Sequence, residues 1–422
     1  MSYLCRRALR ALAAATFLGL FALAGASAQS KDPIRVGAGL SLTGGTAAPG
    51  KVIHTALEIW RDDINAKGGL LGRPVELVVY DDQSNPSNVP GLYTKLIAVD
   101  KVDLLVGPYG TNFVAPAMPT IMQNNKLTVS ITAIGINRRF KYPKYFSMLS
   151  VGPDGINAFA KGFFEIAAAQ KPKPQTVAIL AADAEFARSC ADGAREELKK
   201  HGFKVVYDQS YRPSTADFSP VIRAIQAVNP DILYIGAYPP DNVGIVRAAN
   251  EIGLSPKMFG GAMIGMLVTP IKVQLGPAMN GLLIGENMTP AALARIPGAP
   301  EFLKRYSAKA AAAGVDPLGF AWGPFAYSAG QVLAKAVTAT KSLDHNKLAD
   351  YMHKANFETV AGSFSYSKDG EWSRSRQLWT QFQNVQPNNL DQFKTGQVQP
   401  ILWPSDMKTG KLIYPYAQAR KK

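Results

Sequence analysis

Two kinds of hydrophobic pattern alternate along most of the chain. Apolar runs of three to seven residues, such as residues 34–40 and 104–106, are too short for a helix and predict buried strands. Between them lie longer segments, such as residues 54–66, whose apolar positions recur every three or four residues and predict amphipathic helices. The other predicted strands are residues 75–80, 128–131, 176–180, 204–207 and 231–235 with a short one near 258; the other predicted helices are residues 89–99, 114–124, 155–170, 186–201, 219–227, 242–252, 300–313 and 322–338.

The strand–helix repeats fall into two successive series, which predict an α/β protein with two doubly wound lobes, each built on a parallel sheet. Residues 145–154 must cross from one lobe to the other, a return crossing is expected near 281–286, and a third between 362–370 and 378–382. Three crossings predict a hinge rather than a linker. We expect a first lobe of residues 31–150 plus 281–362, and a second lobe of residues 151–280 plus 363–422 that includes the C-terminal tail.

Residues 102–115 contain the most informative junction of the chain. The apolar run 104–106 predicts a strand, Gly107-Pro108 ends it, and Thr111 or Asn112 can cap the helix that follows. Free backbone N–H groups and the positive end of a helix dipole meet at such a point, and the Thr111 hydroxyl can join them. This junction therefore predicts a site for a small carboxylate.

The first 28 residues have the order of a secretory signal peptide. Arg6, Arg7 and Arg10 precede the apolar run 11–25, and small residues up to Ala28 suit cleavage there. No Cys comes directly after Leu23-Ala24-Gly25, so we expect no lipid anchor and a soluble periplasmic protein. No later segment approaches the ~18 apolar residues of a membrane span.

Composition excludes several classes of function. The formal net charge of +15 makes nucleic-acid binding a function to consider. Lys and Arg are scattered, however, and cluster only at residues 420–422, so we expect no nucleic-acid partner. Without the signal peptide Cys190 is the single cysteine, which excludes an internal disulfide and a Cys-based metal site. The four His are dispersed and lack metal-ligand spacing. We expect neither a metal nor a cofactor. The mature chain of roughly 394 residues is also longer than a domain with a single hydrophobic core usually is, so two domains are expected.

Two near-miss motifs argue against nucleotide binding and catalysis. Residues 45–52 resemble a phosphate-binding loop, but Val52 stands where a Ser or Thr is required and Pro49 removes a backbone donor. Ser328 lies in a hydrolase-like pattern with His345 and His353 downstream, yet within an Ala-rich helical segment rather than at a strand-to-helix elbow. No nucleophile, base and orienting acid come together.

The chain resembles periplasmic ligand-binding proteins of the leucine/isoleucine/valine-binding type, which deliver ligands to ABC importers. The resemblance covers nearly all of the mature chain and is most specific at Asn-Ala-Lys-Gly-Gly-Leu-Leu-Gly-Arg-Pro, residues 65–74. Other matching segments are residues 34–45, Tyr80-Asp-Asp82, Val106-Gly-Pro108, residues 186–193 and residues 247–254. The resemblance implies a monomeric clamshell that closes on one small ligand and docks on an inner-membrane permease.

The resemblance also carries a set of ligand-binding positions onto this chain. Gly110 and Thr111 match the carboxylate-binding loop, and Asp154 matches an acid that helps to hold the ammonium group of amino-acid ligands. A second ammonium-binding acid of the family falls on Ala262, so one anionic partner is missing. The remaining carried-over positions are Ala133 and Gly135 in a companion loop, Phe186 and Tyr238 as aromatic groups of the second lobe, and Phe320 as an apolar surface.

These departures leave the ligand class open. A buried ammonium without anionic partners costs several kcal/mol, and Pro49 stands near the position of an aromatic wall in the amino-acid binders. We therefore expect a branched-chain or other hydrophobic amino acid, or else an amine-free aromatic or hydrophobic carboxylate. Glu251 or Glu286 could supply the missing charge. Two other functions remain open, an exported hydrolase that uses the same cleft and a sensory subunit.

Overall fold

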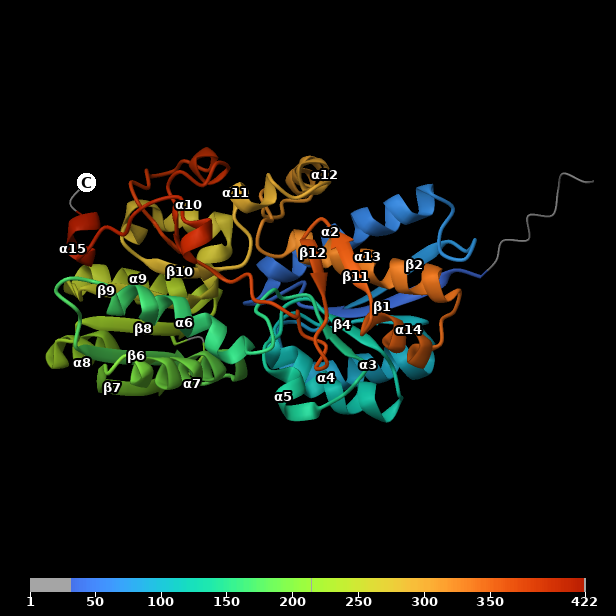
Figure 1. Cartoon of the computed structure of the whole chain (residues 1–422), viewed down its shortest axis with the longest axis horizontal. Coiled ribbons are helices and arrows are strands. Elements are labelled where there is room, and N and C mark those ends of the chain that lie inside the picture. Colours follow the sequence, from blue (N-terminus) through green and yellow to red (C-terminus); the bar gives the residue numbers. More distant parts are fainter. Residues whose placement is uncertain (1–31, 214, 421–422) are drawn as a thin grey trace, which may run out of the picture.

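The structure is a computed structural model that describes residues 32–213 and 215–420. The predicted signal peptide, residues 1–28, lies outside the described residues. Figure 1 shows two lobes side by side along the longest axis, one containing the blue and cyan strands β1 and β4 and the other the green and yellow strands β6 to β10. Each lobe consists of a sheet with helices packed against it.

The first lobe is built on a five-stranded parallel sheet with the order β2-β1-β3-β4-β5. β1 (Ile34–Leu40) is nearly continuous in apolar and glycine residues because both faces of a parallel strand are covered. The other strands are β2 (Val75–Asp81), β3 (Leu104–Val106), β4 (Thr128–Ser130) and β5 (Tyr145–Ser147). The helices are α2 (Ala47–Ala66), α3 (Val89–Thr94), α4 (Thr111–Gln123), α5 (Ile136–Phe140), α12 (Ala299–Ala312), α13 (Gly323–Thr340) and α14 (His345–Met352), and a hairpin of β11 (Asn356–Thr359) and β12 (Gly362–Ser365) lies beside them in Figure 1.

The second lobe is built on a seven-stranded sheet with the order β14-β13-β10-β9-β8-β6-β7. Its strands are β6 (Thr176–Ala182), β7 (Lys204–Tyr211), β8 (Ile232–Ala237), β9 (Met258–Met263), β10 (Leu283–Glu286), β13 (Leu378–Gln381) and β14 (Ile401–Trp403). Its helices include α6 (Gly155–Ala168), α7 (Glu185–Lys200), α8 (Ser219–Val228), α9 (Pro239–Ile252), α10 (Thr269–Leu275) and α15 (Tyr416–Ala419), and α11 (Pro290–Leu293) follows β10.

The two-lobed α/β fold predicted from the sequence is confirmed, with one addition. β13 and β14 pair in antiparallel fashion at one edge of the second sheet. A parallel strand needs a crossover of a dozen or more residues on the same lobe. β13 instead enters directly from the first lobe, so it can run in the opposite direction.

The segments that join the lobes are bonded to one another. The backbone N–H of Arg376 donates to the Ser150 carbonyl at 2.7 Å, and the Asn287 amide donates to the Gln377 side chain at 2.9 Å. The sequence-based division assigned residues 281–362 to the first lobe, whereas Leu283–Glu286 pairs with β9 and β13 of the second sheet. We therefore propose that the return crossing follows Glu286.

Candidate functional site

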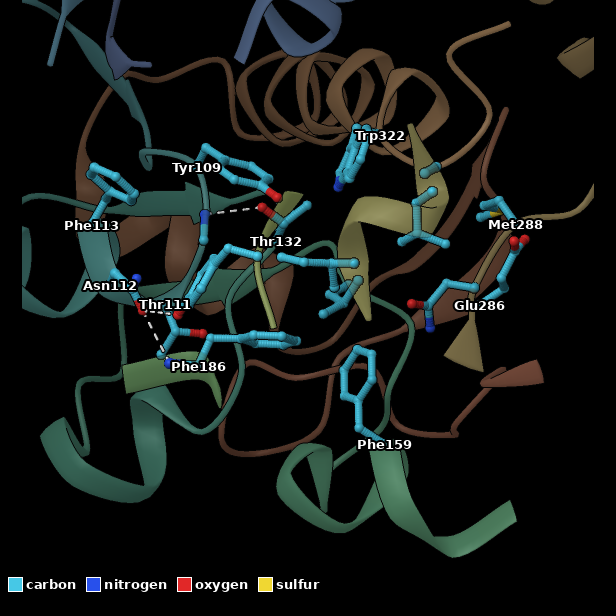
Figure 2. Close-up of a pocket in the computed structure, with 17 residues that line it drawn as sticks. Tyr109, Thr111, Asn112, Phe113, Thr132, Phe159, Phe186, Glu286, Met288 and Trp322 are labelled. Atoms are coloured by element: carbon cyan, nitrogen blue, oxygen red, sulfur yellow. Dashed lines mark hydrogen bonds between the residues drawn. The ribbon is translucent and has the colours of Figure 1, made fainter. Parts of the chain in front are cut away.

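A cavity lies between the two lobes. In Figure 2, Thr111, Asn112 and Thr132 lie at one end and Glu286 and Met288 at the other, with Trp322 and Phe159 on opposite sides. The wall is mostly aromatic and aliphatic with polar groups at a few points, as in small-molecule sites generally. The lining residues are Tyr109, Gly110, Thr111, Asn112, Phe113, Thr132, Leu149, Phe159, Phe186, Tyr238, Ile264, Leu267, Glu286, Asn287, Met288, Ala321 and Trp322.

The first-lobe end of the cavity is the start of helix α4. Gly110 has φ +78°, a conformation that L residues rarely adopt, and this turn directs the chain from β3 into α4. Gly110 donates its N–H to Thr132 Oγ1 at 3.1 Å, and Thr111 Oγ1 accepts the N–H of Ile134 at 3.1 Å. Both threonine hydroxyl groups can still donate a proton.

The first N–H groups of α4 are also available at this end. The N–H groups of Phe113 and Val114 bond back to the Gly110 carbonyl, whereas those of Thr111 and Asn112 precede the intrahelical hydrogen bonds. Two backbone donors, two hydroxyl donors and the positive end of a 13-residue helix therefore meet at one spot. This arrangement suits a carboxylate.

Asn112 connects the two lobes directly. Its Oδ1 accepts the backbone N–H of Phe186 at 3.0 Å and the hydroxyl of Tyr238 at 2.6 Å. Phe186 lies in the first turn of α7, and Tyr238 immediately precedes α9. The described conformation is therefore one in which the lobes are in contact across the cavity.

The second lobe contributes an aromatic wall. The Phe186 ring lies 5.4 Å from that of Phe159 and 6.0 Å from that of Tyr238, measured between centroids, and both pairs are edge-to-face. Burial raises the pKa of the Tyr238 hydroxyl, which therefore stays protonated and donates to Asn112. The wall suits a flat or bulky apolar ligand body.

Glu286 is the acidic residue of the cavity lining, and its carboxylate is already engaged. It lies 3.6 Å from the Lys272 ammonium and accepts a hydrogen bond from the Gln399 amide. Burial raises the pKa of Glu286, while Lys272 acts in the opposite direction. The negative charge of Glu286 is thus paired with the Lys272 ammonium of the protein itself.

The structure brings four of the sequence-predicted site residues to this cavity: Gly110, Thr111, Phe186 and Tyr238. The other five do not line it. Ala133 is fully buried within the first lobe, Ala262 is buried in β9, and Phe320 is partly buried against the core. Gly135 and Asp154 line a separate hollow beside the hinge, shared with Lys141, Lys368 and Glu371.

Asp154 lies at the start of α6 and is held by that helix. Its carboxylate accepts a hydrogen bond from the Asn157 amide at 2.9 Å, and the same amide nitrogen lies 3.0 Å from Glu196. The side chain therefore takes part in a local network of the second lobe. The contact between Asp154 and a ligand ammonium stays a prediction.

Sequence reasoning did not assign binding roles to Tyr109, Thr132, Phe159 and Asn287, and it considered Asn112 only as a possible cap. A usable signal existed for Thr132, which follows β4 at the edge of the sheet where ligands of parallel sheets collect. Asn112 carries no such signal, because its partners lie 74 and 126 residues away.

The residues considered for hydrolysis are held apart by other partners. Ser328 is buried within α13, and its Oγ accepts the Ala361 N–H. His345 Nδ1 accepts the Leu127 N–H, and His353 bonds to the Pro143 carbonyl.

Among residues 32–213 and 215–420, no group of three or more His, Cys, Asp or Glu side chains could hold a metal ion. No helix in this part of the chain is long and apolar enough to cross a membrane.

A family model described as periplasmic binding protein matches residues 33–380. The chain belongs to this family. A protein of Pseudomonas aeruginosa named leucine-, isoleucine-, valine-, threonine- and alanine-binding protein is 26% identical over 354 residues, which are 83% of this chain and 90% of the relative. The resemblance predicted from the sequence is confirmed.

Solved structures of substrate- and solute-binding proteins share this fold. A branched-chain amino acid transporter substrate binding protein of Streptococcus pneumoniae, in complex with isoleucine, superposes with a TM-score of 0.72 at 20% identity and covers 88% of this chain and 100% of its own. A solute binding protein of an ABC transporter from R. palustris, in complex with 4-hydroxybenzoate, gives 0.73 at 19% identity, covering 84% and 94%. The matched family and relatives are binding proteins, so this chain is a binding protein rather than an enzyme.

Proposed function

We propose that this protein is the exported receptor of an ABC importer and that it closes on one small carboxylate ligand with an aromatic or hydrophobic body. The observation that carries this proposal is the position of Asn112, which lines the cavity and bonds both Phe186 and Tyr238 of the opposite lobe. A ligand that contacts both lobes stabilises the closed form over the open one. The closed form is then the one that a permease in the inner membrane recognises.

The start of α4 is the proposed carboxylate site. The backbone N–H groups of Thr111 and Asn112 and the hydroxyl groups of Thr111 and Thr132 converge there. Hydrogen bonds to a charged acceptor are worth about 1.5–3 kcal/mol each. This is enough to orient a ligand before the second lobe closes over it.

The charge balance of the cavity favours a ligand without an amine. Glu286 is already paired with Lys272, and Asp154 lies in the hollow beside the hinge. A buried ammonium would find no free carboxylate among the described lining residues, and leaving it unpaired costs several kcal/mol. An aromatic or hydrophobic acid avoids this cost and fits the wall formed by Phe159, Phe186 and Trp322.

The second candidate ligand class is the branched-chain amino acids. It is favoured by the name of the Pseudomonas aeruginosa relative, which matches over most of both chains. If the ligand is an amino acid, a water molecule or a rearranged Glu286 would have to bind its ammonium group.

The remaining proposals concern localisation and oligomeric state. They are a signal peptide of residues 1–28, export to the periplasm without a lipid anchor, and a monomer in solution.

Thermal unfolding of the mature protein with a panel of ligands tests the proposal. The panel contains leucine, isoleucine, benzoate and 4-hydroxybenzoate, because a ligand at 100 times its Kd stabilises the folded state by about 2.7 kcal/mol. We expect the aromatic acids to raise the unfolding temperature more than leucine does. Calorimetry with recovery of the unchanged ligand separates binding from hydrolysis, and stabilisation by leucine alone would favour the amino-acid class.

A further inference from the structure

Two aromatic donors line the cavity side by side. The rings of Tyr109 and Trp322 are 6.0 Å apart between centroids, with an interplanar angle of 84°. Their exposed fractions are only 3% and 4%. Figure 2 shows the Tyr109 hydroxyl oxygen and the Trp322 indole nitrogen directed into the middle of the cavity.

Neither the Tyr109 hydroxyl nor the Trp322 indole N–H forms a hydrogen bond with another residue among 32–213 and 215–420. Burial raises the pKa of Tyr109, so its hydroxyl keeps its proton and can donate. Buried tyrosines elsewhere in the chain are satisfied, since the hydroxyl of Tyr93 donates to the Val106 carbonyl and that of Tyr142 to the Lys126 carbonyl. Buried polar groups normally have such partners.

Other unpaired aromatic donors in the described chain occupy a different setting. The polar atoms of Tyr145, Trp372 and Trp379 also lack partners, but they are sealed within packed protein and none of these residues lines the cavity. Tyr109 and Trp322 instead face the space that a ligand would fill. Their missing partner is therefore one that the ligand can supply.

A carboxylate at the start of α4 does not require these two donors. A carboxylate offers about four lone-pair positions, and four donors already meet there, the N–H groups of Thr111 and Asn112 and the hydroxyl groups of Thr111 and Thr132. A ligand with a pure hydrocarbon body would bury the Tyr109 and Trp322 donors without partners. Such a site discriminates against ligands that lack the matching acceptor.

We propose that Tyr109 Oη and Trp322 Nε1 together donate to an oxygen on the body of the ligand, so that the receptor selects oxygenated acids over their hydrocarbon counterparts. This inference rests on the proposed function and narrows its ligand class to aromatic or hydrophobic carboxylates that carry a hydroxyl, carbonyl or ether oxygen. Tyr109 and Trp322 are then the residues that determine specificity, while the start of α4 binds the carboxylate common to all such ligands.

The test is a comparison of matched ligands by titration calorimetry on the mature chain. The probes are benzoate and its hydroxyl and methyl derivatives at the 2-, 3- and 4-positions, which are similar in size and differ in the acceptor oxygen. We expect the wild type to bind the best hydroxybenzoate at least about ten-fold more tightly than the corresponding methylbenzoate. Tyr109→Phe and Trp322→Phe should each reduce this ratio, and the double variant should bring it to within about two-fold of unity.

Because the readout is a ratio of affinities, general loss of packing in Trp322→Phe affects both ligands and cancels. Tyr142→Phe, which removes a buried hydroxyl remote from the cavity, should leave the ratio unchanged. Thr111→Ala should weaken both ligands equally. A wild-type ratio near one, or an unchanged ratio in the double variant, would overturn the inference alone. If no probe binds but leucine or isoleucine stabilises the protein, the inference fails while the protein remains a receptor for a carboxylate; if no ligand of either panel binds, the proposed function fails as well.

Discussion

Asn112 Oδ1, on the first lobe, accepts the hydroxyl hydrogen of Tyr238, on the second lobe, at 2.6 Å. The same oxygen accepts the Phe186 N–H at 3.0 Å. Both contacts exist only when the lobes approach each other, so they contribute to the free energy of closure and not to the stability of either lobe alone. Closure contacts of this kind change ligand affinity without touching the ligand.

Asn112→Ala should therefore weaken ligand binding by about ten-fold or more, because two hydrogen bonds of the closed form are lost. Tyr238→Phe removes one of them and keeps the ring, so its effect should be smaller. A double-mutant cycle on binding free energy should show coupling between the two positions. Small-angle scattering should show reduced ligand-induced compaction in Asn112→Ala, and normal compaction with full affinity would contradict the assigned role.

Thr111→Ala should affect both binding and stability. The variant loses a proposed donor to the ligand carboxylate and leaves the Ile134 N–H without its acceptor at a site only 2% exposed. We expect about ten- to a hundred-fold weaker binding and a loss of ~1–3 kcal/mol in the free energy of unfolding. Thr111→Ser retains the hydroxyl and is the matched control for calorimetry and denaturant unfolding; equal behaviour of the Ala and Ser variants would remove this hydroxyl from the site.

Asp154→Asn distinguishes the two ligand classes. Asp154 bonds to Asn157 and lines the hollow beside the hinge, so for an amine-free acid we expect the affinity to change by less than about two-fold. If the ligand is an amino acid held by Asp154, binding should be abolished, because a buried ammonium would lose its anionic partner. Titration of the variant with both ligand classes makes this measurement.

Glu371→Gln should change how stability depends on pH. Glu371 is buried near Tyr145 and Tyr366. Neither of its carboxylate oxygens has a hydrogen-bond partner among the described residues. Burial raises the pKa of Glu371 from 4.5 to about 8. The folded state therefore keeps this proton while the unfolded state loses it. Between pH 4.5 and 8 this carboxyl group makes the folded state progressively less stable as pH rises.

The Gln variant should remove this contribution. We expect it to unfold with a free energy close to that of the wild type at pH 4.5 and a few kcal/mol higher at pH 8, since each pKa unit corresponds to about 1.4 kcal/mol. Denaturant titrations at both pH values make the comparison. Glu251→Gln, at an exposed position, controls for the loss of one negative charge, and equal pH profiles of wild type and Glu371→Gln would refute the prediction.

Much of the fold could be predicted because its signals are local. The short apolar run of β3 and Gly107-Pro108 lie within a few residues of the helix start and mark the junction. The predicted cap at Thr111 or Asn112 was wrong, because α4 begins at Thr111 and its N-cap is Gly110. β10 was harder to predict, because the sequence of its four residues is compatible both with a crossing between the lobes and with a strand that pairs with β9. Only the partner strand distinguishes the two arrangements.

The sequence by itself determined the alternation of strands and helices over most of the chain, the two-lobed architecture and the strand-to-helix junction between β3 and α4. It also placed Ser328 within a helical segment rather than at a catalytic turn. All of these features follow from periodicity and turn chemistry over short distances. Tertiary structure decided which side chains face the cavity. It brought Asn112 to Tyr238 across 126 residues, placed Tyr109 against Trp322, and put Asp154 in a different hollow from Thr111. A site between two lobes depends on their relative orientation and on side-chain direction, which no local pattern encodes.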